Sequence, residues 1–107
     1  MTTKYVSPGP TREDIDSSRG ALVLEFGTDW CGFCRAAAAF VEEALSGFSS
    51  LRHVKLEDGP GRRLGRSFQV KLWPTLIFLK DGIEVTRVVR PRNAEEIRAG
   101  MTRVCDD

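Results

Sequence analysis

The sequence has little of what several classes of protein depend on. Three cysteines, one of them isolated near the C-terminus, are too few for a framework of structural disulfides. A formal net charge of +1 gives no global attraction to nucleic acid or to a membrane surface. No apolar run approaches the length of a membrane span, and residues 1–10 lack the apolar centre of a signal peptide. We therefore expect a cytoplasmic protein, in which a lone cysteine pair is more often catalytic than structural.

Candidate metal ligands are also scarce. A structural zinc site takes four ligands, and beside Cys31 and Cys34 only His53 and Cys105 are available. We therefore expect no metal. His53 has no second histidine or carboxylate cluster around it, so it is interpreted as an ordinary strand residue. Cys105 is expected to be an unpaired, non-catalytic thiol, with a regulatory or dimer-linking role as the alternative.

The patterns that are present predict one domain over residues 1–107. Apolar runs predict strands at residues 21–26, 51–57, 75–79 and 83–89. Capping residues and helical periodicity predict helices at residues 12–18, 32–45, 62–68 and from 94 onward. The pair Asp81-Gly82 predicts a hairpin between the last two strands. This order implies a mixed sheet with helices on both faces, preceded by a loosely ordered leader over residues 1–10.

The run WCGFC at residues 30–34 stands where an apolar run gives way to a helical pattern. Two thiols three residues apart can close a small, reversible disulfide. At a helix N-terminus the first thiol also meets unpaired backbone N–H groups and the positive end of the helix dipole, which favour the reactive thiolate. The motif therefore indicates redox chemistry, with a permanently oxidised pair, a merely packed pair or a zinc site as alternatives.

Nearly the whole chain resembles the thioredoxin family. WCGFC resembles the family's WCxxC motif, residues 73–75 (WPT) resemble its cis-proline loop, and residues 80–82 (KDG) match its hairpin turn. The resemblance implies a thioredoxin fold and a thiol–disulfide oxidoreductase that acts on protein disulfides without a metal or bound cofactor. It also implies a flavoprotein thioredoxin reductase as electron donor, and we expect a monomer. The alternative is a thioredoxin-like module that binds a partner protein and whose redox activity is incidental.

The resemblance also implies catalytic roles. Cys31 is expected to attack the substrate disulfide, and Cys34, one helical turn deeper, to resolve the mixed disulfide. Glu25 matches the family's acid six residues before the first cysteine, and its strand parity with Val23 directs it toward a buried face. Burial disfavours a charged carboxylate, so Glu25 is a candidate proton acceptor for Cys34. Lys55 matches the family's lysine on the neighbouring strand and could pair with Glu25; a solvent-facing carboxylate is the alternative.

Substrate is expected to bind around the first cysteine. The positions carried over from the family are Trp30, Gly32, Phe33, Trp73, Pro74, Thr75 and Arg90. Their aromatic members would form an apolar patch that suits extended protein segments. Pro74 is expected to follow a cis peptide bond, with a trans proline at the start of a strand as the alternative.

Three of these positions depart from the family pattern. Phe33 stands where the reducing thioredoxins have proline, which implies a more oxidising disulfide. Trp73 is bulkier than the family's usual residue before the cis-proline. Arg90 falls near a glycine that borders the substrate groove, so we expect a positive charge there that favours acidic partners.

Overall fold

Four strands form one mixed sheet in the order β2-β1-β3-β4, in a computed structural model that describes residues 4–48 and 50–105. The strands are β1 (Ala21–Gly27), β2 (Arg52–Glu57), β3 (Thr75–Lys80) and β4 (Ile83–Val89). β1 pairs parallel with β2 and antiparallel with β3, and β3 pairs antiparallel with β4. The predicted mixed sheet is therefore confirmed.

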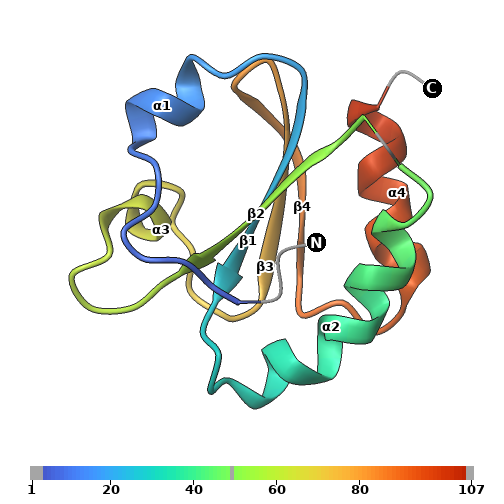
Figure 1. Ribbon diagram of the computed structural model, residues 1–107, viewed down its shortest axis with the longest axis horizontal. Helices are drawn as coiled ribbons and strands as arrows, with labels where there is room; N and C mark the ends of the chain where they lie inside the picture. Colours follow the sequence, from blue (N-terminus) through green and yellow to red (C-terminus); the bar gives the residue numbers. More distant parts are fainter. Residues whose placement is uncertain (1–3, 49, 106–107) are drawn as a thin grey trace.

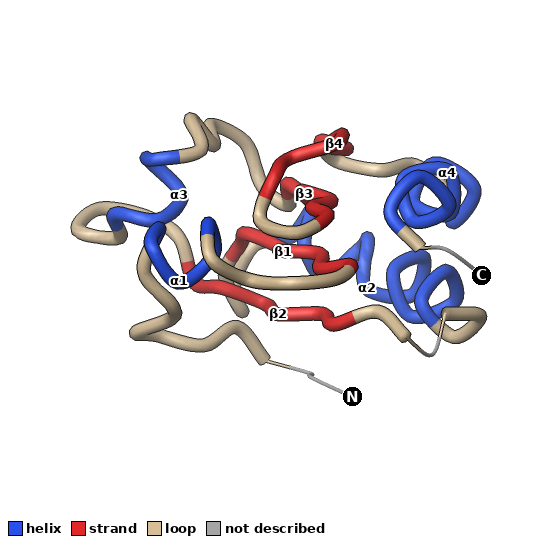
Figure 2. The backbone as a smooth tube through the Cα atoms, turned by 90° about the horizontal axis from the view of Figure 1, so that it is seen from above, coloured by secondary structure: helices blue, strands red, loops and turns tan. Residues whose placement is uncertain are grey.

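Helices cover both faces of this sheet, as predicted (Figures 1 and 2). They are α1 (Arg12–Asp16), α2 (Gly32–Leu45), α3 (Arg63–Ser67) and α4 (Ala94–Val104). Figure 2 shows α2 and α4 on one side of the sheet, and α1 and α3 on the other. In the described part of the chain, no helix is long and apolar enough to cross a membrane.

The central strand β1 separates two apolar cores. Leu22, Leu24 and Phe26 belong to the core on the side of α1 and α3. Val23 belongs to the core beneath α2 and α4. Because side chains alternate along a strand, Glu25 lies on the same face as Val23, and it is only 1% exposed. The parity of β1 thus carries a carboxyl group into the interior, next to the start of α2.

The hairpin between β3 and β4 is confirmed and is tied to the end of α1. Asp81 and Gly82 have φ values of 51° and 81°, as a tight two-residue hairpin turn requires. The Gly20 N–H donates to Asp81 Oδ1 at 2.8 Å, and the Asp81 N–H donates to the Gly20 carbonyl at 3.1 Å. A Cβ on Gly82 would collide with the Asp16 carbonyl, so the close approach of the two segments requires glycine here.

The N-terminal segment is attached to the sheet, so the expected loose order of residues 1–10 does not hold where the segment meets β2. The Val6 N–H donates to the Lys55 carbonyl at 2.9 Å, and the Glu57 N–H donates to the Val6 carbonyl at 3.0 Å. The reason is that β2 lies at the edge of the sheet and offers unpaired backbone groups. The first three residues lie outside the described residues. This attachment brings Tyr5 to the end of β1.

Candidate active site

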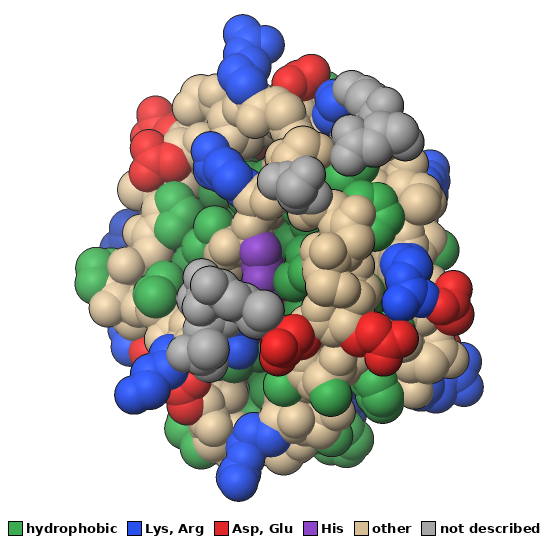
Figure 3. Space-filling model, turned by 45° about the vertical axis from the view of Figure 1, so that its right-hand side comes forward, with side chains coloured by type: hydrophobic (Ala, Val, Ile, Leu, Met, Phe, Trp, Pro, Cys, Tyr) green, Lys and Arg blue, Asp and Glu red, His purple; other side chains and the backbone are tan. Residues whose placement is uncertain are grey.

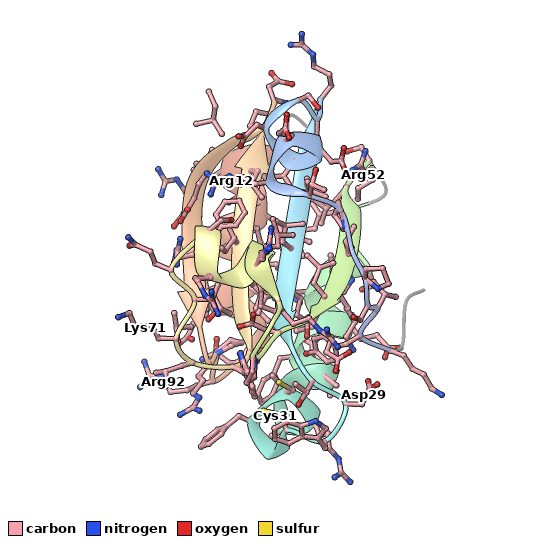
Figure 4. The ribbon with its side chains drawn as sticks, turned by 90° about the vertical axis from the view of Figure 1, so that its left-hand side faces the viewer. Arg12, Asp29, Cys31, Arg52, Lys71 and Arg92 are labelled. Atoms are coloured by element: carbon pink, nitrogen blue, oxygen red, sulfur yellow. The ribbon has the colours of Figure 1, made fainter. Side chains whose placement is uncertain are left out.

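The cysteine motif lies where β1 ends and α2 begins. Cys31 is the N-cap of α2, and its Sγ accepts the backbone N–H of Cys34 at 3.3 Å. This N–H belongs to the first helical turn, whose amides have no carbonyl partner within the helix. Figure 4 shows Cys31 and Asp29 at the same end of the molecule, with Arg52 toward the opposite end. The sulfur of Cys31 therefore lies at the positive end of the helix dipole.

Both thiols of the motif are free and buried. Cys31 is 8% exposed and Cys34 is 3% exposed. The expected order of accessibility is kept, but Cys31 is not an openly exposed thiol. Access of a substrate disulfide to Cys31 is therefore limited.

The surroundings of Cys34 hold its proton tightly. Burial raises the pKa of the Cys34 thiol to about 11, and the hydrogen bond with Cys31 acts in the same direction. The backbone N–H of Thr28 and the hydroxyl of Tyr5 oppose this rise because both stabilise the thiolate. At neutral pH, Cys34 is therefore a thiol that needs a base before it can attack.

The buried carboxylate of Glu25 has two hydrogen-bonding partners, one of which, Tyr5, also interacts with Cys34. The hydroxyl of Tyr5 donates to Glu25 Oε2 at 2.8 Å. The imidazole Nε2 of His53 lies 2.8 Å from Glu25 Oε1. Both oxygens of the buried carboxylate are thus bonded, which offsets the cost of removing it from water.

The interpretation of His53 as an ordinary strand residue is wrong. In the parallel register, Val23 lies opposite His53 and Glu25 lies opposite Lys55, so His53 shares a face with Glu25. Its side chain is 12% exposed and is visible in purple at the surface in Figure 3. The register of β1 and β2 is the signal that could have identified His53. No local signal marks Tyr5, whose position depends on the attachment of the N-terminal segment.

Lys55 lies next to the same cluster. It is the register partner of Glu25 on β2, and its ammonium nitrogen lies 4.4 Å from the centre of the Tyr5 ring. Cation–π contact of this kind fixes the ring while leaving the hydroxyl free to act elsewhere. The direct pairing of Lys55 with Glu25 stays a prediction.

An aromatic rim, made of Trp30, Phe33 and Trp73, borders the cysteine pair. Trp30 and Phe33 are 71% and 57% exposed. Trp30 meets Trp73 edge to face, with ring centroids 5.7 Å apart. The indole N–H of Trp73 donates to Asp58 Oδ2 at 2.8 Å, which fixes the ring. The rim leaves apolar surface for an extended segment of a partner protein.

The loop from Trp73 to Thr75 is firmly held. The Trp73–Pro74 peptide bond is cis, and both Pro74 and Thr75 are buried. The Thr75 hydroxyl donates to the Leu72 carbonyl at 2.6 Å. Gly32, across the site, is the exposed first residue of α2. The structure thus brings the carried-over positions of the motif and of the loop to the same end of the sheet.

Arg90 is engaged with the rim rather than free at its edge. Its Nε donates to the Trp73 carbonyl at 2.8 Å, and its guanidinium carbon lies 3.8 Å from the centre of the Phe33 ring. The predicted positive charge is therefore beside the motif, but it is stacked on an aromatic face. Arg90 has a left-handed backbone, with φ at 51°, just after β4.

Metal ligands do not cluster in the described residues. Within 4–48 and 50–105, no three His, Cys, Asp or Glu side chains lie close enough together to hold a metal ion. The chemistry that this site can perform with its own groups is thiol–disulfide exchange, since two thiols, a helix N-terminus and a buried carboxylate meet there.

Fold and site together define a thiol–disulfide oxidoreductase, and comparison with known proteins agrees. The chain belongs to the thioredoxin family, whose model matches residues 3–103. It is 33% identical over 89 residues to thioredoxin-2 of Saccharomyces cerevisiae, covering 83% of this chain and 86% of that protein. It is 38% identical over 77 residues to thioredoxin of Mycobacterium tuberculosis, covering 71% and 66%.

A solved structure of the same family shares this architecture closely. Thioredoxin 2 from Pseudomonas aeruginosa PAO1, in its reduced form, is 51% identical and superposes with a TM-score of 0.86. The match covers 96% of this chain and 95% of that chain. The protein is therefore a protein-disulfide oxidoreductase with a thioredoxin fold.

Proposed function

We propose that Cys31 is the attacking thiol and Cys34 the resolving thiol in the reduction of protein disulfides. The observation that carries this assignment is the position of Cys31 Sγ at the N-cap of α2, where it accepts the Cys34 N–H. Amide donors and the helix dipole at this position favour a thiolate. Cys34 is more deeply buried and keeps its proton at neutral pH.

The reaction then proceeds in two exchanges. The Cys31 thiolate attacks one sulfur of the substrate disulfide, and the other substrate sulfur leaves with the electron pair. Cys34 then loses its proton and attacks Cys31 Sγ, which closes the Cys31–Cys34 disulfide and releases the second substrate sulfur as a thiolate. Two electrons pass from the dithiol to the substrate. A flavoprotein thioredoxin reductase is the proposed donor that restores the dithiol.

Glu25 is the proposed proton acceptor for Cys34 in the second exchange. A thiol whose pKa is about 11 is almost entirely protonated at neutral pH, so resolution needs a base. Glu25 is buried beside the pair, and its Oε2 is linked to Cys34 through the hydroxyl of Tyr5. Lys55, with its ammonium over the Tyr5 ring, is proposed to hold this cluster in place.

Substrate binding is assigned to the aromatic rim and the adjoining loop. Exposed aromatic surface around a buried thiol favours an extended, partly apolar protein segment. The residues proposed to contact it are Trp30, Gly32, Phe33, Trp73, Pro74, Thr75 and Arg90. We expect a monomer. A reducing cytoplasm is the proposed location, because a catalytic dithiol is kept reduced there.

Trapping of mixed disulfides tests the cysteine roles. Cys34→Ser should accumulate a covalent adduct with a disulfide-bonded protein such as insulin, seen on a non-reducing gel and mapped to Cys31 by mass spectrometry. Cys31→Ser should form none, and Cys105→Ser should behave as wild type. Equal trapping by Cys31→Ser and Cys34→Ser would contradict the assignment.

A further inference from the structure

The hydroxyl of Tyr5 lies between the resolving thiol and the buried carboxylate. It donates to Glu25 Oε2 at 2.8 Å, and its interaction with Cys34 lowers the pKa of that thiol. A phenol hydroxyl can accept one proton while it donates another. A continuous chain of exchangeable protons therefore runs from Cys34 through Tyr5 to Glu25.

Gly27 provides the space in which these two groups meet. An ideal Cβ on Gly27 would lie 2.5 Å from Cys34 Sγ and 2.8 Å from Tyr5 Oη. The sulfur and the hydroxyl oxygen thus converge over the same backbone position at the end of β1. Any larger residue at this position would push them apart.

Several contacts hold Tyr5 in this position. Its N–H donates to Asp29 Oδ1 at 3.2 Å, and its ring lies under the ammonium of Lys55. Val6, the next residue, is fixed to β2 by two backbone hydrogen bonds. The backbone of this segment and one face of the ring are therefore held in place, and the hydroxyl lies close to the reacting sulfur.

We propose that Tyr5 relays the Cys34 proton to Glu25 during resolution of the mixed disulfide. As the thiol gives its proton to Tyr5 Oη, the hydroxyl proton passes to Glu25 Oε2. The Cys34 thiolate then attacks Cys31 Sγ, the bond from Cys31 to the substrate sulfur breaks, and the electron pair leaves with the substrate. Tyr5 ends the step neutral, and Glu25 holds the proton.

Other charged and titratable groups surround the relay. Cys31, His53, Lys55 and Asp29 also face the cluster, from α2, from β2 and from the loop before α2. Burial and the nearby carboxylate raise the pKa of Tyr5 above its ordinary value, so the phenol regains a proton rather than remaining a phenolate. Tyr5 therefore transfers a proton and is itself neutral before and after the step.

The relay rests on the proposed roles of Cys31, Cys34 and Glu25, and one experiment separates the two proposals. Reduced protein in a Cys105→Ser background reacts with dithionitrobenzoate, an aromatic disulfide whose released thiolate is coloured. The first release reports attack by the nucleophilic cysteine, and the second reports resolution. If Cys31→Ser keeps the first phase, or Cys34→Ser keeps the second, the proposed cysteine roles fail.

With those roles in place, Tyr5→Phe tests the relay itself. We expect an unchanged attack phase and a resolution phase at least about tenfold slower at neutral pH, as loss of general-base assistance produces. Wild-type resolution should be nearly independent of pH around neutrality, whereas resolution in Tyr5→Phe should rise with hydroxide concentration. Val6→Thr, in the same segment and with its backbone bonds intact, should match wild type.

Two outcomes would overturn the relay while leaving the cysteine roles standing. One is an equal resolution rate in Tyr5→Phe and wild type. The other is a slower rate with the same pH profile, which assigns Tyr5 a packing role. Because the chain contains one tyrosine, biosynthetic fluorotyrosine alters the acidity of Tyr5 alone with little change in shape. It should change the resolution rate at least twofold and leave the attack phase as it is; no change contradicts the relay.

Discussion

Cys31 and Cys34 lie on one turn of α2 but meet different surroundings. Cys31 caps the helix and accepts an amide N–H, whereas Cys34 is enclosed by Cys31, Tyr5 and the end of β1. The two thiols therefore differ in exposure and in the groups that surround their sulfurs. Chemical modification of the individual cysteines measures this difference.

Alkylation with iodoacetamide should distinguish the two thiols. Near neutral pH, Cys31 should be modified first, because Cys34 is both less exposed and almost fully protonated. Labelling of Cys34 should become appreciable only as the pH approaches about 11, where its thiolate forms. Peptide mapping measures both sites in one sample, and preferential labelling of Cys34 at neutral pH would contradict this ordering.

The reduction potential depends on the residue between Cys31 and Cys34. Phe33 is an exposed residue of the first turn of α2, where proline can be tolerated. Phe33→Pro should restrict the backbone between the cysteines and favour the disulfide. The reduction potential should fall by roughly 30 mV for each 1.4 kcal/mol by which the disulfide is stabilised relative to the dithiol. Phe33→Ala, which removes the ring without fixing the backbone, is the control in glutathione equilibration. A shift to less negative potential in Phe33→Pro would contradict the argument.

Elements with strong local signals lie where the sequence predicts them, whereas features that depend on residues distant in the sequence could not be predicted from it. The helix over 32–45 and the Asp81-Gly82 hairpin were predicted because capping, periodicity and turn chemistry are local. Attachment of the N-terminal segment depends on the open edge of β2. For the same reason Tyr5 was missed: nothing near it in the sequence indicates that Glu25 and Cys34 lie beside it.

The loop that follows β4 offers a test at the level of an element. Arg90 is held in the left-handed region, which favours glycine, yet it bridges Trp73 and Phe33. Arg90→Ala loses the bridge and keeps the strained backbone, whereas Arg90→Gly loses the bridge and relieves the strain. Urea unfolding should show Arg90→Gly more stable than Arg90→Ala by about 1 kcal/mol. If Arg90 restricts access to Cys31, iodoacetamide should modify this thiol faster in both variants than in wild type. Equal stability of Arg90→Gly and Arg90→Ala would mean that the backbone at this position is not strained.

For the whole molecule, burial of the redox cluster links stability to pH. Burial raises the pKa of both Cys34 and Tyr5, so the folded state holds their protons more tightly than the unfolded state does. The stabilisation is fully present below the ordinary pKa of the Cys34 thiol, near 9, and is lost as the pH rises through about 11. Both groups act with the same sign.

The free energy of unfolding of the reduced protein should therefore fall as the pH rises above about 9. Other groups titrate in this range, so the comparison that matters is with Cys34→Ser, which lacks the thiol. Denaturant unfolding at several values from neutral pH upward should show a steeper loss in wild type than in Cys34→Ser. Parallel curves would mean that the Cys34 proton is held no more tightly in the folded state.

Reduction of insulin disulfides tests the central claim most directly. The wild-type protein, supplied with NADPH and a flavoprotein thioredoxin reductase, should reduce insulin catalytically, and Cys31→Ser and Cys34→Ser should not. If only dithiothreitol supports turnover, the oxidoreductase stands and the proposed electron donor is wrong. Failure of the wild type with either reductant, despite measurable binding of the substrate protein, would contradict the account and indicate a binding module.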